Sequence, residues 1–264
     1  MMCKVQHLLE SMFKLKVLGD LKYFLGLQLA RSSEGIVLSQ RKYTLSILEN
    51  TNFVDAKPIS LSMETNLRMS ASDGDPLDDP FTYRRIIGRL IYLTISRPNI
   101  TYAVSILSQF LSKPTTTHLT ALHHLLRYLK GSVGQGLLFS AKSELRLIAY
   151  ADADDWTGCP NTRRSVTSYY VFIGDSLISW RSKKQHTVSR SSTESKYQAM
   201  AAVAAELTLL RGLFFEFQAD ILSSMFFFYS QSVIHITTNP TFHERTKHIE
   251  IDYHFVREQV MADF

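Results

Sequence analysis

The spacing of apolar residues divides the chain into a largely helical first part and a second part that opens with strands. In five segments apolar side chains recur every three to four residues, and this period predicts a helix for each. These segments are residues 4–16, 43–50, 82–95, 98–112 and 117–130. Residues 55–82 lack such a period, carry three prolines and include the polar run SASDGDPLDD, which predicts a long surface connection.

Strand-like segments accompany these helices. The run LKYFLGLQLA at residues 21–30 is followed by the turn residues SSEG and by IVLSQ, so a β-hairpin is predicted here. Gly131 is expected to end the last helix, and GLLF after it is expected to lead toward the strands of the second part.

The second part combines strands with one long helix. Residues 145–150, 167–173 and 177–180 predict three strands, the last two around the turn GDS. A helix rich in Ala and Leu is predicted for residues 191–217, followed by a strand at 225–229. Further short elements are expected at residues 230–237, 248–251 and 253–261. Strands joined by a crossover helix to a further strand predict an α/β (α+β) fold with a mixed sheet flanked by helices.

Composition excludes several classes of protein. With 264 residues, of which 45% are hydrophobic, the chain can form one large or two modest domains and is not a disordered protein. It has no run of about 18 apolar residues and no signal-peptide core at its start, so we expect neither a membrane span nor secretion. Cys3 and Cys159 do not form a disulfide framework, which favours an intracellular location in the cytoplasm or nucleus.

The net charge of +5 is unevenly distributed. Residues 1–144 contain 17 Lys and Arg against 11 Asp and Glu, whereas residues 145–264 contain 12 against 13. A basic part beside a slightly acidic one suits a polyanion that is held by the first and processed by carboxylates of the second. Ordinary surface charge explains the same counts.

A cluster of carboxylates follows the strand at 145–150. Asp152, Asp154 and Asp155 come at its end, within YADADDW. Unpaired carboxylates are costly to bury, so this cluster faces either water or a cation. A solvated turn is the simpler interpretation, because Asp favours turns.

Long motifs in a fixed order connect the chain to a known family. Six segments together resemble the Pol polyprotein of copia-type LTR retrotransposons. They are LGDLKYFLGLQLARSSEGIVLSQRKY, YRRIIGRLIYLTISRPNITYAVSILSQF, LRYLKG, YADADDWTGCPNTRRS, ISWRSKKQHTVSRSSTESKY and RTKHIEIDYHFVRE. The resemblance covers nearly the whole chain.

The resemblance implies two regions. Residues 1–144 correspond to the C-terminal part of the reverse transcriptase, a mainly helical thumb and connection with a small hairpin that resembles the primer grip. Residues 145–264 correspond to an RNase H-like domain. The Tyr-x-Asp-Asp polymerase motif of the family does not occur in this sequence, so DNA polymerisation is not expected from this chain.

For the second region the resemblance implies hydrolysis of the RNA strand of an RNA–DNA hybrid by two Mg²⁺ ions about 4 Å apart. Asp152 matches the acid of the first strand, or Asp154 does if the register shifts, since DADDW stands where the family has DADW. His248 matches the family histidine, and Glu250 or Asp252 the final acid, so Asp152 and Asp252 are the expected metal ligands, with Asp154 as an alternative.

Two ligand positions of the family carry other residues here. The helix motif SSxExEY reads SSTESKY, which places Lys196 at the ligand position, and in the fourth strand Tyr229 replaces an aspartate. A neutral phenol is a poor Mg²⁺ ligand. Glu194 lies about 200° around the helix from position 196 and forms a capping-box pattern with Ser191, so a cap explains it better than metal binding does.

Whether the chain is an enzyme therefore stays open at this point. We expect a retrotransposon-derived fragment whose hybrid cleavage is lost or strongly impaired, because a lysine opposes a pair of divalent ions. The alternative is an active Mg²⁺-dependent ribonuclease H with a displaced acid set, namely Asp152, Asp154, Glu194 and Asp252.

Nucleic-acid binding can persist without catalysis. Basic residues around the strands and the loop before the long helix are expected to contact an RNA–DNA hybrid or another nucleic acid through its phosphates. These residues are Arg163, Arg164, Arg181, Lys183, Lys184 and Arg190. The other partner implied by the resemblance is the reverse-transcriptase palm and fingers, normally part of the same chain.

Overall fold

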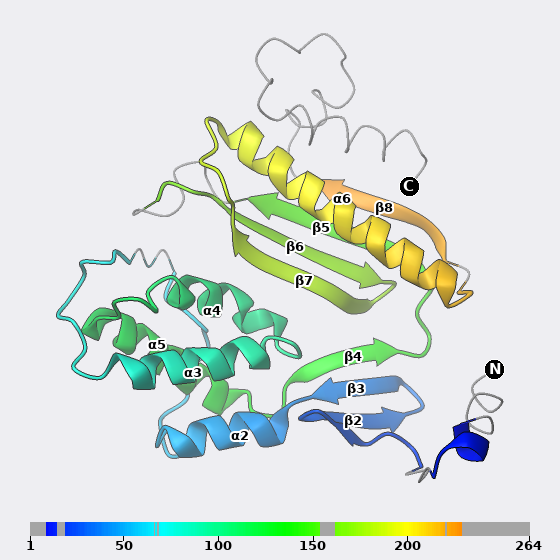
Figure 1. Ribbon diagram of the computed structural model, residues 1–264, viewed down its shortest axis with the longest axis horizontal. Coiled ribbons are helices and arrows are strands. Elements are labelled where there is room, and N and C mark those ends of the chain that lie inside the picture. The colour runs from blue at the N-terminus through cyan, green and yellow to red at the C-terminus, as the bar shows by residue number, and fades with distance from the viewer. Residues whose placement is uncertain are drawn as a thin grey trace.

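The computed structural model describes residues 9–14, 19–65, 67, 69–153, 162–219 and 221–228. It is a mixed α and β structure with two four-stranded sheets. In Figure 1 a group of helices and the first sheet lie side by side, and the second sheet lies above them with one long helix across it. The predicted mixture of helices and strands is confirmed.

The first sheet contains four antiparallel strands in the order β1-β2-β3-β4. They are β1 (Tyr23–Phe24), β2 (Leu27–Ser32), β3 (Gly35–Ser39) and β4 (Gly136–Ser140). The prediction of one strand over residues 21–30 is wrong, because Leu25 and Gly26 form a turn with φ of 48° and 77°. The Tyr92 hydroxyl, from a neighbouring helix, donates to the Leu25 carbonyl and supports this turn.

The pairing of strand β4 differs more from the sequence-based prediction than the break at Leu25 and Gly26 does. It completes the first sheet by pairing with β3, about 100 residues earlier, instead of leading into the second sheet. Gly35 permits the close approach, since a Cβ at this position would lie 2.0 Å from the Phe139 carbonyl oxygen. Local apolar patterns carry no information about such a long-range pairing.

Five helices of the first part surround the larger hydrophobic core. They are α2 (Arg41–Asn50), α3 (Pro80–Leu93), the short 3₁₀ helix η1 (Pro98–Ile100), α4 (Thr101–Ser108) and α5 (Thr116–Gly131). Asp79 caps α3 by accepting from the Phe81 and Thr82 amides, and Pro80 occupies its first position. The helix predicted for 98–112 is shorter than expected, because α4 ends at Ser108.

Arg97 lies in this core although it carries a charge. Its side chain is 1% exposed, and its guanidinium donates to the Asn99 side chain, the Ser132 carbonyl and hydroxyl and the Gln135 side chain. Burial lowers the pKa of Arg97, an effect that Tyr128 opposes. The network joins the start of η1 to the chain that leaves α5.

The long connection between α2 and α3 packs against α5. His118 stacks on Phe110 at 3.8 Å between ring centroids and approaches the Ser70 carbonyl, while His124 and Arg127 contact the carbonyls of Leu61 and Lys57. Side-chain to backbone hydrogen bonds therefore hold a segment that has no regular structure of its own.

Protonation of His118 is expected to weaken this packing. Its Nδ1 accepts from the Thr115 amide, and burial lowers its pKa despite opposing effects of Ser70 and Asp73. An unfolded histidine protonates near pH 6.5, above the value in the folded chain, so acid favours unfolding as the pH falls below about 6.5. Denaturant titrations at pH 7.5 and 5.5 should show a smaller loss of stability for His118→Gln than for the wild type. An equal loss in both proteins would contradict this assignment.

The second sheet is mixed, with the order β7-β6-β5-β8. Its strands are β5 (Arg146–Ala153), β6 (Val166–Ile173), β7 (Ser176–Lys184) and β8 (Leu222–Phe228), and the helix α6 (Ser192–Glu216) precedes β8. Strands β5, β6 and β7 are antiparallel neighbours, whereas β8 runs parallel to β5. The predicted series of three strands, helix and strand is confirmed.

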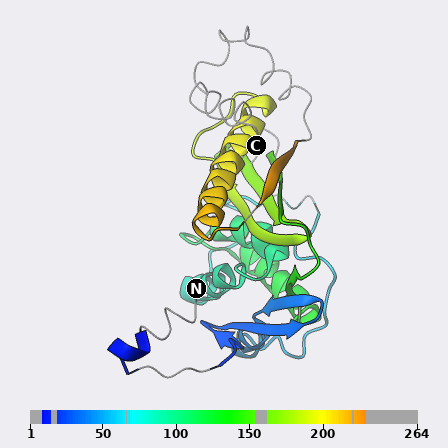
Figure 2. The same ribbon diagram turned by 90° about the vertical axis from the view of Figure 1, so that its right-hand side faces the viewer.

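Helix α6 covers one face of this sheet, as Figure 2 shows. Val203 and Leu207 on the helix pack against Leu147, Ala149 and Val171 on the strands and form a second hydrophobic core. Among the described helices, α6 alone is long and apolar enough for a membrane span by length and composition, which is weak evidence for one. Its packing on the sheet accounts for the apolar residues on its inner face.

The two sheets meet through β7. The Trp180 indole donates to the Thr94 carbonyl at 3.2 Å, and the Ser140 amide donates to the Ser176 hydroxyl at 3.0 Å. These bonds place the outer edge of the second sheet against the helices and the first sheet.

Candidate functional site

Asp152 lies at the end of β5, as the sequence predicts. Its side chain is exposed, its Oδ1 accepts from the Ala153 amide at 2.9 Å, and its backbone pairs with Ser168 of β6. An exposed carboxylate at a strand end is suitable for a cation and equally suitable for water.

Lys196 lies on the side of α6 that faces the sheet. Residues 200, 203 and 207 lie within about 40° of residue 196 around a helix, and Val203 and Leu207 pack on β5 and β6. Figure 1 shows that β5 ends at the same end of the sheet at which α6 begins. Asp152 and Lys196 therefore belong to the same corner of the sheet, and Lys196 is half-buried there.

Glu194 is held at the beginning of α6. The Ser191 hydroxyl accepts from the Glu194 amide at 3.1 Å, and the Glu194 carboxylate accepts from the Arg190 amide at 2.7 Å. The predicted cap is thus present, although the carboxylate contacts Arg190 and not Ser191. Glu194 is 8% exposed and is engaged by this bond, which leaves it poorly suited to a metal ion at the end of β5.

The remaining residues that the sequence indicates for metal binding or catalysis are Asp154, Tyr229, His248, Glu250 and Asp252, and all lie outside the described residues. Within the described chain, no three His, Cys, Asp or Glu side chains gather in a way that could hold a metal ion. The described part of the corner offers one exposed carboxylate and one lysine. This set does not fit a pair of Mg²⁺ ions.

The predicted basic residues do not form one surface. Arg181 and Lys183 pair across the sheet with Tyr169 and Thr167 of β6. Because Tyr169 belongs to the core under α6, Arg181 and Lys183 also lie on the helix-facing side.

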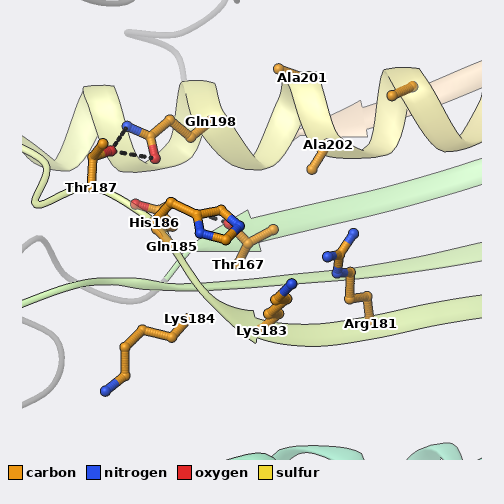
Figure 3. Close-up of a pocket in the computed structure, with 11 residues that line it drawn as sticks. Thr167, Arg181, Lys183, Lys184, Gln185, His186, Thr187, Gln198, Ala201 and Ala202 are labelled. Carbon is orange, nitrogen blue, oxygen red and sulfur yellow. Dashed lines mark hydrogen bonds between the residues drawn. The ribbon is translucent and has the colours of Figure 1, made fainter.

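The other four are oriented differently. The Lys184 side chain extends away from α6 (Figure 3), as the alternation of β7 requires, although the residue lines the same groove as Arg181 and Lys183. Arg163 and Arg164 precede β6, and Arg190 precedes α6; all three are exposed.

A groove of about 580 Å³ lies between β7 and α6. Arg181 and Lys183 extend from β7 toward the helix (Figure 3), and Lys184 of β7 also lines the groove. Ala201, Ala202 and Ala205 line it from α6. Thr167 contributes from β6, while Gln185, His186, Thr187 and Gln198 lie at the end near the start of α6. We call this feature the β7–α6 groove.

Its end is ordered by a chain of hydrogen bonds. The buried Gln185 amide donates to the Thr167 hydroxyl at 3.1 Å and to the Ser195 carbonyl at 2.8 Å. The Gln198 amide donates to the Thr187 hydroxyl at 3.1 Å. Sequence reasoning missed these residues and the alanines. The available signals were the alternation of SWRSKK and the helical spacing of residues 198, 201, 202 and 205.

A carboxylate lies near the groove but already has partners. Glu206 accepts from the Ser179 hydroxyl at 2.7 Å and from the Tyr169 hydroxyl at 3.3 Å. Burial raises the pKa of Tyr169, Glu206 raises it further, and Arg181 opposes the shift. Arg181 is therefore oriented by Tyr169 at one end of the groove.

Comparison with known proteins agrees with the order of motifs along the chain. No protein-family model matches the sequence. The retrovirus-related Pol polyprotein from transposon RE2 of Arabidopsis thaliana is 41% identical over 98% of this chain, and that from transposon TNT 1-94 of Nicotiana tabacum is 33% identical over 98%. An uncharacterized mitochondrial protein of Arabidopsis thaliana is 45% identical over 200 residues, 76% of this chain and 82% of that protein.

The chain spans only about a fifth of the two polyproteins, 18% and 20% of their lengths. The similarity nevertheless extends over nearly all of this sequence, with its helical part, its two sheets and the Asp152 strand included. The chain therefore belongs to the family of retrovirus-related Pol polyproteins from copia-type transposons.

Proposed function

We propose that this chain is a nucleic-acid-binding fragment of a retroelement Pol protein whose RNase H-type centre is inactive or strongly impaired. The observation that carries the proposal is Lys196 on the sheet-facing side of α6, at the same corner as Asp152. A fixed positive charge at a site for two divalent cations opposes their binding.

The topology of the second sheet supports an RNase H-like domain in residues 145–264. Three antiparallel strands are followed by a helix that crosses one face and by a strand parallel to the first. In that interpretation Asp152 is the first metal ligand. The same centre contains His248 and one further acid, Asp252 or Glu250. Mg²⁺ is the ion of the proposed ancestral activity.

The first part is proposed to be a reverse-transcriptase thumb and connection with a primer-grip-like hairpin. The β1–β2 turn exposes Tyr23, Phe24 and Leu25, which are between 53% and 70% exposed. Large exposed apolar groups that lie together mark contact surfaces. The palm and fingers of a longer Pol protein are the partner that this interpretation implies.

The alternative is an active nuclease with the displaced acids Asp152, Asp154, Glu194 and Asp252. The bond from the Arg190 amide to Glu194 weighs against it, since metal binding would compete with a helix cap. Cys3 and Cys159, which form no disulfide framework, favour an intracellular location for either version.

Binding and cleavage should separate in one experiment. The purified chain is mixed with a labelled RNA–DNA hybrid, and anisotropy and gel electrophoresis follow binding and cleavage with Mg²⁺ or Mn²⁺. We expect binding that weakens steeply between 50 and about 200 mM salt, with no cleavage above a protein-free control. Robust Mg²⁺-dependent cleavage would favour the displaced acid set, and absence of binding at low salt would refute the proposal.

A further inference from the structure

We infer that the β7–α6 groove holds a backbone phosphate of the bound nucleic acid, gripped by Arg181 and Lys183. The inference rests on the proposed nucleic-acid binding and assigns its phosphate contact to one place. It also separates these two cations from Arg163, Arg164 and Arg190, which do not line the groove, and from Lys184, which lines it but extends away from α6.

The charge of the groove favours an anion. Arg181 and Lys183 lie two residues apart on the same face of β7, and no Asp or Glu is among the described residues that line the groove. Within the described residues, neither side chain forms an ion pair with a carboxylate, and nearby Glu206 is engaged by Ser179 and Tyr169. Two neighbouring cations without a counterion repel each other, and a bound anion removes that cost.

The walls favour a phosphate over a bulkier or apolar ligand. Ala201, Ala202 and Ala205 contribute only methyl groups to the lining, and these small side chains leave the space that the cations enter. Guanidinium and ammonium groups together supply donors in several directions, which suits the oxygens of a phosphate.

The groove is also accessible along its length. Arg181, Lys183, His186 and Ala205 are exposed, so a polymer can contact the cations without an opening step. The Thr187–Gln198 pair and buried Gln185 fix the end of the groove, which keeps β7 and α6 at a constant separation. A preformed site of this kind loses little entropy on binding.

A lysine outside the groove provides a matched test. Lys183→Gln removes one charge from the groove, and Lys113→Gln removes the same charge from an exposed position that does not line it. Fluorescence anisotropy with an RNA–DNA hybrid should show about fivefold to tenfold weaker binding for Lys183→Gln and a salt slope reduced by about one. Lys113→Gln should change affinity by less than about twofold.

A second variant leaves the charge unchanged and tests whether binding needs the open space of the groove. Ala205→Leu adds bulk to the exposed wall of the groove, and leucine is compatible with a helix. We expect it to weaken binding as Lys183→Gln does, with unchanged circular dichroism and thermal midpoint. Equal losses for Lys183→Gln and Lys113→Gln, with no effect of Ala205→Leu, would overturn the groove assignment while nucleic-acid binding itself stands.

A titration with inorganic phosphate distinguishes a backbone phosphate of nucleic acid from the free phosphate ion as the ligand of the groove. Calorimetry with phosphate alone measures whether the groove binds the free ion. Phosphate binding that is lost in Lys183→Gln, together with unchanged affinity for the hybrid, would overturn a backbone contact in favour of a free-anion site. If the wild type binds no nucleic acid, the proposed function fails together with this inference.

Discussion

Replacement of Lys196 by glutamate and Tyr229 by aspartate is expected to restore Mg²⁺-dependent cleavage of an RNA–DNA hybrid. The double variant returns both acids of the family pattern and removes the opposing charge. A unit positive charge about 4 Å from a cation costs about 4 kcal/mol at an effective dielectric of 20. This is equivalent to about a thousandfold in a rate or a binding constant.

The measurement is the initial rate of hybrid cleavage as a function of Mg²⁺ concentration. Lys196→Gln alone should not restore activity, because it removes the charge without supplying a ligand. Arg211→Glu with Tyr229→Asp is the matched control, since it makes the same change of charge at an exposed position of α6 about 22 Å farther along the helix and outside the groove. Equal activity of this control and of the Lys196→Glu double variant would show that position 196 is not a ligand position.

Replacement of Arg97 by methionine is expected to destabilise the protein by about 2 kcal/mol. Four acceptors lose a donor: the Asn99 side chain, the Ser132 carbonyl and hydroxyl, and the Gln135 side chain. Asn99 and Ser132 are half-buried, whereas Gln135 is exposed and keeps a bond from the Asn99 amide. A lost hydrogen bond in such a setting costs about 0.5–1 kcal/mol. Methionine fills much of the volume, so lost hydrogen bonds and not a cavity dominate the change.

Urea denaturation and the thermal midpoint measure this effect. Arg97→Lys keeps the charge but lacks the planar set of five donors, and we expect it to recover only part of the lost stability. Arg85→Met on the exposed side of α3 is the control and should change stability by less than about 0.5 kcal/mol. Wild-type stability of Arg97→Met would mean that the network contributes little to folding.

The helices of the first part were predictable because each buries one face. Residues such as Ile86, Ile87, Leu90 and Leu93 recur at helical spacing and are fully or nearly fully buried in α3. Asp79 and Pro80 mark the beginning of that helix in the sequence. Local patterns therefore predicted the helices and most of their ends.

The first sheet was only partly predictable. The β2–β3 hairpin has a local turn, but the break at Leu25–Gly26 depends on a left-handed turn that Tyr92 supports from α3. The β3–β4 pair joins segments about 100 residues apart, and the sequence around Gly136 contains no sign of its partner.

The candidate site was also only partly predictable from the sequence. Asp152 and the capping pair Ser191 and Glu194 were predicted from short segments, and the described structure places Asp152 at the end of β5 and both capping residues at the start of α6. Which of the six basic residues share a surface was not predictable from the sequence, because the neighbouring Lys183 and Lys184 extend to opposite faces of one strand.

The sequence by itself determined the family, the series of elements and the presence of lysine and tyrosine at two positions that the resemblance assigns to metal ligands. These follow from residue identity and short-range periodicity, which do not depend on distant contacts. Only the tertiary structure decided which strands pair, that Lys196 turns toward the sheet at the Asp152 corner, and that Arg181 and Lys183 share a groove with three alanines of α6. The reason is that a groove or a corner consists of side chains from separate elements, and the packing of those elements is a property of the whole chain.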